Sequence, residues 1–282
     1  MGETINWQTC DLNDLIPNAY LRGAMDRLLD RLVKQGQDLV LTIDGKEGSG
    51  KSKLARQIGA YCARRTATPF GVKNIHFDLF GYMNSAGLMV KCGIKGGVNI
   101  MDESRTLLYS RDGGTTELKM FTKWMAVARA DQLIHIFCIP AIHDMDKYIR
   151  EHRTAMYINV FYKVVPTKED GFAGGYKMMR GYGTMYDQRE MKPFLDSKTS
   201  KGSYGYPPLA PELRKIRTFT FPDREVLLDY DVYAEKKRQS TYDIYLKEFV
   251  ENEKNNESKS RKRVPGRAKL QHIDVTGHDA AE

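Results

Sequence analysis

The sequence feature that most constrains this chain is a glycine-rich loop of eight residues, Gly45-Lys-Glu-Gly-Ser-Gly-Lys-Ser52. An apolar, β-rich run over residues 38–44 precedes the loop, and a helical pattern over residues 53–63 follows it. Strand, loop and helix in this order form the phosphate-binding βα unit of the P-loop type, whose pattern is G-x-x-x-x-G-K-S. The chain is therefore predicted to fold around a strand whose carboxyl end binds phosphate.

The loop has the chemistry that a nucleoside triphosphate requires. Its glycines allow successive backbone N–H groups to converge on phosphate oxygens at a helix N-terminus. The ammonium group of Lys51 would reach the β- and γ-phosphates, and the hydroxyl of Ser52 would coordinate Mg²⁺. We expect ATP and Mg²⁺ as cofactors. The predicted nucleotide contacts are Gly45, Lys46, Glu47, Gly48, Ser49, Gly50, Lys51, Ser52 and Lys53.

A second motif lies about 50 residues downstream, where the apolar run of residues 98–101 ends in Asp102 and Glu103. In P-loop ATPases an acid at the end of a buried strand helps to hold Mg²⁺, and a following glutamate can polarise the attacking water. An apolar run that ends in two acids can also mark a strand that simply leaves the core. Its distance from the loop favours the functional interpretation. Asp102 is predicted as the metal-side acid and Glu103 as the catalytic base.

The rest of the pattern alternates between strands and helices. We expect further strands at residues 74–80, 98–101, 133–139 and 155–165, and helices at 18–34, 115–129 and 144–152. Such alternation predicts an α/β fold, a P-loop NTPase with a mostly parallel sheet that helices cover on both faces.

Composition divides the chain into four segments. Residues 176–186 read as a hairpin, 230–250 as a helix, and the polar residues after 251 as disordered. The expected organisation is an N-terminal helical segment at 1–36, an ATPase core at 37–166, a Tyr- and Gly-rich hairpin, loop and helix at 167–250, and a disordered basic tail at 251–282.

The order of these motifs resembles the ATPase core of zonula occludens toxin-like phage proteins and of the FtsK/HerA class of DNA-pumping motors. The residues that carry the resemblance lie within 39–165: Asp102-Glu103, Tyr109-Ser-Arg111-Asp112, the helix ending Ala128-Arg129, the strand 133–139 and the run Asp146 to Arg153. The resemblance implies a RecA-like (ASCE) sheet and a homo-oligomeric ring. It also implies DNA as a partner and, for packaging or virion assembly, capsid or portal proteins.

The chain departs from the family in two places. The family usually has a polar sensor, most often Gln, at the end of the strand after the acidic pair. Here that strand ends Phe137-Cys138-Ile139-Pro140, so the sensor is missing or His143 or Asp144 replaces it. Toxin-like members also carry a transmembrane segment, whereas the longest apolar stretch here, 133–142, is half the length of a membrane span. We expect no membrane span and a cytoplasmic location.

Ring ATPases usually complete the site with an arginine from the neighbouring subunit, because negative charge on the γ-phosphate must be neutralised. Arg111, Arg129, Arg150 and Arg153 all lie in the corresponding region. Arg129 closes a helix where the resemblance places an arginine, and Arg153 lies one turn from Arg150. Arg129 and Arg153 are the candidates, and the alternative for each is a surface arginine that pairs with a nearby acid.

Positive charge is concentrated after the predicted nucleotide site. The net charge is +8, yet residues 1–146 carry 18 basic and 16 acidic residues, whereas residues 147–224 carry 15 and 8. Tyr interleaved with Lys and Arg in 176–186 could track phosphates and stack on bases, or it could be a hairpin with its aromatic side chains inward. The cations of 259–269 could form a nucleic-acid arm or a solubilising tail.

These observations favour an ATP-hydrolysing motor that acts on DNA, in viral genome packaging or virion morphogenesis. One alternative is a nucleotide or small-molecule kinase, which shares the loop but leaves the Asp-Glu pair unexplained. Another is an ATP-dependent DNA-binding switch that does not translocate. The response of ATP turnover to DNA or to a nucleoside monophosphate separates the motor from the kinase, and a triplex-displacement assay separates the motor from the switch.

Overall fold

The computed structural model describes residues 4–102, 116–167, 175–191, 217–243 and 246. Glu103 and Arg111 lie outside these residues. The chain divides into two compact units, Met1–Lys236 and Lys237–Glu282, and the fold below is that of the first.

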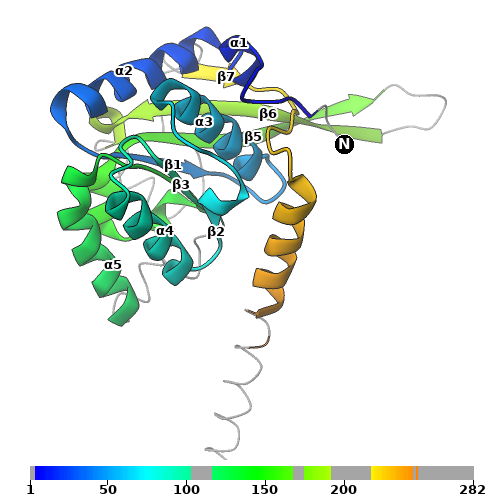
Figure 1. Ribbon diagram of the computed structural model, residues 1–282. Coiled ribbons are helices and arrows are strands. Elements are labelled where there is room, and N and C mark those ends of the chain that lie inside the picture. The colour runs from blue at the N-terminus through cyan, green and yellow to red at the C-terminus, as the bar shows by residue number, and fades with distance from the viewer. Residues whose placement is uncertain (1–3, 103–115, 168–174, 192–216, 244–245, 247–282) are drawn as a thin grey trace, which may run out of the picture. The chain divides into compact units, whose positions relative to one another are not determined.

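A seven-stranded sheet with the order β2-β3-β4-β1-β5-β6-β7 forms the centre of this unit (Figure 1). The strands from β2 to β5 in this order pair in parallel, and β6 and β7 continue the sheet in antiparallel. The strands are β1 (Leu39–Asp44), β2 (Ile75–His76), β3 (Val98–Met101), β4 (Ile134–Cys138), β5 (Thr154–Thr167), β6 (Gly175–Asp187) and β7 (Thr218–Thr220). The predicted α/β fold with a mostly parallel sheet is confirmed.

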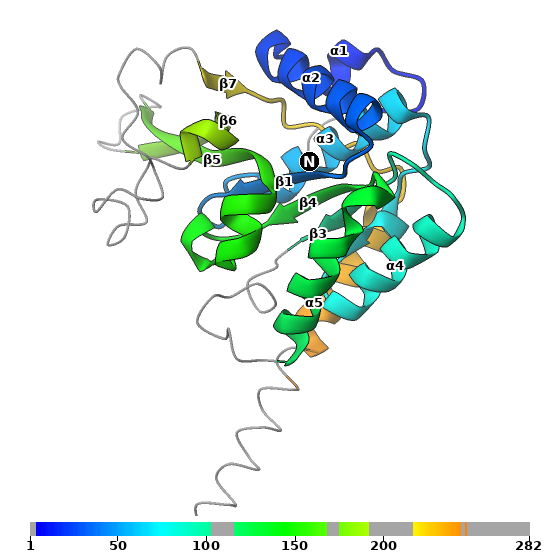
Figure 2. The same ribbon diagram turned by 90° about the vertical axis from the view of Figure 1, so that its left-hand side faces the viewer.

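Helices cover both faces of the sheet, as Figure 2 shows. On one face lie α1 (Leu12–Leu15), α2 (Ala19–Gln35) and α3 (Lys51–Thr66), and on the other lie α4 (Leu79–Lys91) and α5 (Thr116–Val127). Two separate apolar clusters result, and successive residues of β1 contribute to them alternately: Leu41 and Ile43 to the α3 face, Val40 to the α5 face. All six residues of β1 are buried, as expected for an interior parallel strand.

Two predicted elements differ from those in the structure. The strand expected at 74–80 ends at His76, because the Asp78 side chain accepts a hydrogen bond from Gly81 N (2.6 Å) and begins α4 there. In place of a regular helix at 144–152 the structure has a 3₁₀ turn, Ile142–Asp144, and a π-helical turn, Ile149–Arg153. Short polar motifs at element ends account for the first difference.

The prediction of a hairpin within residues 176–186 is wrong, because these residues form a single strand, β6, that pairs with β5. The glycines of β6 allow residues of a neighbouring segment to approach the strand closely, and they do not form a turn. A Cβ on Gly183 would lie 2.5 Å from the Phe219 ring, and one on Gly181 would lie 2.4 Å from Phe221 O. The sheet therefore continues past residue 166, where the sequence suggested a boundary. A helix at 230–243 follows β7.

Two tyrosines of β6, Tyr182 and Tyr186, stack on aromatic residues of the neighbouring strand β5. The Tyr186 ring stacks on Tyr157 with centroids 5.3 Å apart, and the Tyr182 ring stacks on Phe161 at 5.8 Å. Of the two interpretations of this segment, inward-facing aromatic side chains fit the structure for these two tyrosines. The cations of the strand, by contrast, are exposed.

A buried polar cluster lies at the amino end of β1, opposite the carboxyl end that leads into the glycine loop. Arg153 donates hydrogen bonds to Asp38 and to Met125 O, and its side chain is buried. The Nδ1 atom of His135 lies 2.5 Å from the hydroxyl of Tyr82. Burial, together with the charge of Arg153, lowers the pKa of His135 to about 3, so this imidazole is neutral.

This cluster corrects the prediction of Arg153 as an arginine that acts across a subunit boundary. Its guanidinium is enclosed and neutralises Asp38, a carboxyl whose pKa burial raises. Arg129, in contrast, is exposed, with Nη2 3.5 Å from the Tyr148 hydroxyl. Arg150 is partly buried and bonds to His143 O (3.2 Å) and Glu151 (3.3 Å). Only Arg129 of the two leading candidates is free to meet another molecule from the surface.

Replacing Arg153 by Ala is expected to lower the free energy of unfolding by about 3 to 5 kcal/mol, since it leaves the Asp38 carboxylate buried without its partner. Arg129→Ala, at an exposed position, should cost less than about 1 kcal/mol. Urea denaturation followed by circular dichroism measures both. An Arg153→Ala protein as stable as the wild type would contradict a structural role for this arginine.

Candidate functional site

The glycine loop takes the conformation that its sequence predicts. Gly45, Gly48 and Gly50 have φ angles of 142°, 72° and 106°, which side-chain-bearing residues rarely adopt. A Cβ on Gly45 would lie 2.0 Å from Val160 O, so the loop passes directly against β5. Gly50 is the N-cap residue of α3, and the loop therefore ends at a helix N-terminus whose first N–H groups favour an anion.

Lys51 spans the loop. Its Nζ atom donates hydrogen bonds to Gly45 O (2.6 Å) and Lys46 O (3.1 Å), at the opposite end of the loop. Burial lowers the pKa of this ammonium group. A partly desolvated cation over the loop is suited to contact the terminal phosphates of a nucleotide, as predicted.

The two predicted metal ligands are in direct contact. Ser52 Oγ donates to Asp102 Oδ1 at 2.7 Å, although 50 residues separate them in the chain. Asp102 is 2% exposed and follows β3. A hydroxyl and a carboxylate are oxygen ligands of the kind that Mg²⁺ prefers, and Mg²⁺ commonly uses one or two such side chains together with water and phosphate oxygens. Within the described residues no group of three or more His, Cys, Asp and Glu forms a metal cage. The residues fit this ion.

The remaining predicted contacts divide into three groups. Lys46, Glu47 and Gly48 are exposed at the tip of the loop, and Ser49 is buried beneath it. The ammonium group of Lys53 pairs with Asp223, so the charge of this side chain is already neutralised by a carboxylate of the chain. Glu103, the predicted base, lies outside the described residues, and its role stays a prediction.

Arg129 lies far from the loop of its own chain. Its carbonyl oxygen accepts a hydrogen bond from Asp38 N (2.9 Å), which places it at the edge of the sheet where β1 begins. The loop follows the opposite end of the same strand. Any contact of Arg129 with a bound phosphate would have to come from another subunit, as the resemblance implies.

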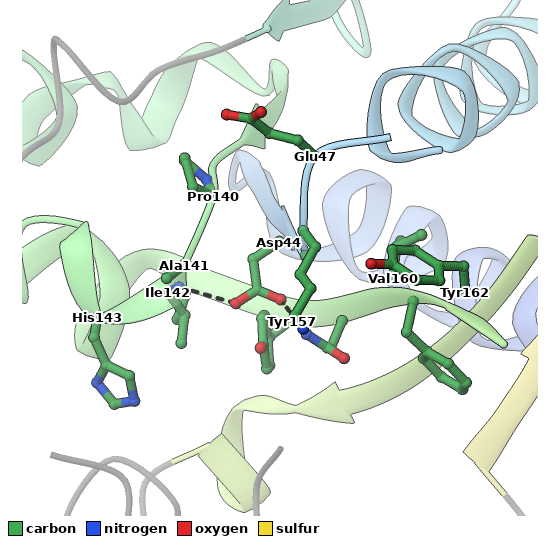
Figure 3. A pocket seen from close by; sticks show the side chains of 13 residues that line it. Asp44, Glu47, Pro140, Ala141, Ile142, His143, Tyr157, Val160 and Tyr162 are labelled. Atoms are coloured by element: carbon green, nitrogen blue, oxygen red, sulfur yellow. Dashed lines mark hydrogen bonds between the residues drawn. The ribbon is translucent and has the colours of Figure 1, made fainter. Parts of the chain in front are cut away.

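A cavity of about 600 Å³ lies beside the first residues of the loop (Figure 3). Its walls come from the loop, from the segment after β4 and from β5. They comprise Asp44, Gly45, Lys46, Glu47, Pro140, Ala141, Ile142, His143, Tyr157, Asn159, Val160, Phe161 and Tyr162. His143, one of the two proposed replacements for the missing sensor, is among them, whereas Asp144 is not. Burial lowers the pKa of His143, which favours the neutral imidazole.

Asp44 is a buried acid of this cavity that the sequence interpretation did not single out. Its Oδ1 accepts a hydrogen bond from Asn159 Nδ2 (2.7 Å) and its Oδ2 from Ile142 N (2.9 Å), as Figure 3 shows. Burial outweighs these bonds and raises the pKa of Asp44 to about 6. The available signal was an acid at the carboxyl end of an apolar strand, immediately before Gly45.

Tyr233 was also missed. Its hydroxyl donates to Asp102 Oδ2 at 2.7 Å, from a helix that begins about 130 residues after that acid. The sequence placed this residue in a C-terminal helix and gave no reason to link it to the predicted metal ligands.

Comparison with known proteins gives matches among solved structures alone. No protein-family model and no curated protein sequence matches this chain. A chain of the E. coli MS115-1 HORMA:CdnC:Trip13 complex is similar at 14% identity and a TM-score of 0.37, over 51% of this chain and 62% of that one, less than two thirds of its length.

Two further structures are similar over most of their own length. The genome packaging NTPase B204 from Sulfolobus turreted icosahedral virus 2, in complex with AMPPCP, matches at 12% identity and a TM-score of 0.36, over 55% of this chain and 95% of that one. The N-terminal domain of zonular occludens toxin from Neisseria meningitidis matches at 13% identity and a TM-score of 0.31, over 54% and 84%.

The sheet order, with β4 between the loop-bearing strand and the strand that ends at Asp102, together with the loop itself, gives this chain a P-loop NTPase fold. In the described part of the chain, no helix has the length and apolar character needed to span a membrane.

The raised pKa of Asp44 predicts a pH-dependent difference between the wild type and Asp44→Asn. The folded state holds the proton of Asp44 more tightly than the unfolded state does, so ionisation between pH 3.8 and about 6 costs stability. The wild type should lose about 3 kcal/mol relative to the variant over this interval, with no further change above it. Urea unfolding at a series of pH values measures the difference, and a flat profile would show that Asp44 titrates normally.

Proposed function

We propose that this chain is an ATP-hydrolysing motor that acts on DNA, in viral genome packaging or virion morphogenesis. The observation that carries the proposal is the 2.7 Å hydrogen bond between Ser52 and Asp102. It joins the residue after the loop lysine to the acid at the end of a second strand, the pair of ligands that a Mg²⁺-nucleotide site requires.

In this proposal the residues of the chain bind and orient the nucleotide. When bound, Mg²⁺ would supply positive charge that offsets the negative charge of the phosphates during hydrolysis. Lys51 and the N-terminus of α3 hold the phosphates, while Ser52 and Asp102 hold the ion. Glu103, next to Asp102, would accept the proton of the attacking water.

The proposed partner is DNA, and the basic residues after the nucleotide site support it. Lys177 and Arg180 are exposed on β6, and Lys163 is exposed on β5. Because Tyr182 and Tyr186 are occupied in packing, the described part of β6 offers phosphate contacts and not base stacking by these rings. The order of motifs resembles that of DNA-pumping motors. This resemblance supports a homo-oligomeric ring in which Arg129 contacts the nucleotide site of the neighbouring subunit. It also supports capsid or portal proteins as assembly partners and a location in the host cytoplasm or the virion.

One observation favours a second candidate, a nucleotide or small-molecule kinase. The cavity of about 600 Å³ opens beside Lys46 and Glu47, where the terminal phosphate of a bound nucleotide would point. A phosphoryl acceptor of small size would fit there.

Lys51→Ala is expected to abolish ATP hydrolysis, because the cation that contacts the terminal phosphates is removed. Glu103→Gln is expected to bind ATP and fail to turn it over. Phosphate release and equilibrium binding of a fluorescent ATP analogue separate the two effects. Lys34→Ala, at an exposed lysine of α2 paired with Asp30, is the control and should keep full activity. Hydrolysis by Glu103→Gln at the wild-type rate would contradict the assignment of the base.

DNA is expected to raise the turnover of ATP, and added salt to diminish the effect, since phosphate contacts release counterions. A double variant, Lys163→Ala with Lys177→Ala, should weaken DNA stimulation without lowering the basal rate. Turnover that responds to nucleoside monophosphates and not to DNA would favour the kinase.

A further inference from the structure

Residues 221–236, which we call the strap, run from β7 along the buried helix α3 to the metal-side acid. Phe221 N donates to Gly181 O (2.8 Å), and the Phe221 ring lies 3.3 Å from the position that a Cβ on Gly50 would occupy. The strap therefore starts against the last glycine of the loop. At its other end the ammonium group of Lys236 bonds to Ile75 O in β2.

Polar side chains of α3 fix the strap along its course. Gln57 Nε2 donates to Pro222 O (3.0 Å) and Arg224 O (2.9 Å). Arg56 forms a bidentate pair with Glu225, with distances of 3.0 and 2.5 Å. The exposed fractions of Arg56 and Glu225 are 4% and 7%, so this pair is shielded from solvent. Removal of either partner would leave a buried charge, which is strongly unfavourable.

Tyr233 brings the strap to the metal site. Its ring lies under the Arg56 guanidinium, 4.4 Å from Cζ to the ring centroid, and beside Phe77 at 5.9 Å. The residue is 3% exposed, so these contacts leave its ring little freedom. Its hydroxyl donates to Asp102 Oδ2 at 2.7 Å.

The two oxygens of the Asp102 carboxylate thus have different partners. Oδ1 accepts from Ser52, the other predicted metal ligand, and Oδ2 accepts from Tyr233. A carboxylate held at both oxygens cannot rotate about its Cβ–Cγ bond without breaking a hydrogen bond. Such outer contacts orient metal ligands and strongly affect metal affinity.

We propose that Tyr233 is a positioning residue for the Mg²⁺ site: it holds Asp102 so that Oδ1 faces the ion beside Ser52. This inference rests on the proposed nucleotide function. The strap comes after all seven strands in the sequence, and in this proposal it contributes to the nucleotide site. The residue acts through Asp102 and does not contact the nucleotide itself.

The test is Tyr233→Phe in the full chain, which removes the hydroxyl and keeps the ring between Arg56 and Phe77. Binding of a fluorescent ATP analogue is titrated with Mg²⁺, and the same binding is measured in EDTA. The variant should need roughly tenfold more Mg²⁺ for half-maximal binding, with unchanged affinity in EDTA. Electron paramagnetic resonance of Mn²⁺ in the presence of the nucleotide reports the metal directly and should show the same shift.

Tyr230→Phe is the matched control. Tyr230 belongs to the same strap, its ring lies 5.6 Å from Tyr233, and it is 36% exposed. Its Mg²⁺ midpoint should equal that of the wild type. An unchanged midpoint in Tyr233→Phe, or an equal loss of affinity with and without Mg²⁺, would overturn the inference alone. Absence of Mg²⁺-dependent nucleotide binding in the wild type would overturn the proposed function as well.

Discussion

The hydrogen bond between Ser52 and Asp102 depends on the register of three strands, and the rest of the site depends on that bond. Leu39 of β1 and Val98 of β3 both pair with Ile134 of β4, so the two outer strands begin at the same level. At their carboxyl ends, Met101 of β3 pairs with Phe137 and Ile43 of β1 pairs with Cys138. The helix after β1 and the acid after β3 therefore lie at the same end of the parallel strands. Alignment by backbone pairing therefore sets the distance between Ser52 and Asp102, two predicted metal ligands that are 50 residues apart.

The elements with a local cause could be predicted from the sequence. The glycines of the loop demand positive φ angles, and the run of residues 98–101 ends in an acid, so both the loop and Asp102 were identified without the structure. Glycine was misleading in β6, where Gly181 and Gly183 serve close approach and not a turn. Nothing local distinguishes the two uses, since the residues that need the space, Phe219 and Phe221, follow more than 30 residues later.

Long-range contacts explain the other differences. Arg129 and Arg153 each lie at the end of a helix predicted from the sequence, yet Arg153 is buried against Asp38 and Arg129 is exposed. Whether each arginine is buried depends on how the turn before β5 packs against the start of β1, and the spacing of residues in the sequence does not reveal this contact. Tyr233 lies about 130 residues from the acid that it holds, and Asp44 is buried only because β5 and the segment after β4 enclose it.

The enclosure of α3 limits how the proposed motor could transmit a change of nucleotide. Ten consecutive residues of the helix, Leu54 to Ala63, are buried, including the polar Arg56 and Gln57. Because close-packed neighbours enclose this helix, a shift or tilt of its axis would require the surrounding core to repack. In the proposed motor, the strap would be suited to respond to the loss of a phosphate, because it lies against Gly50 of the loop and bonds to Asp102.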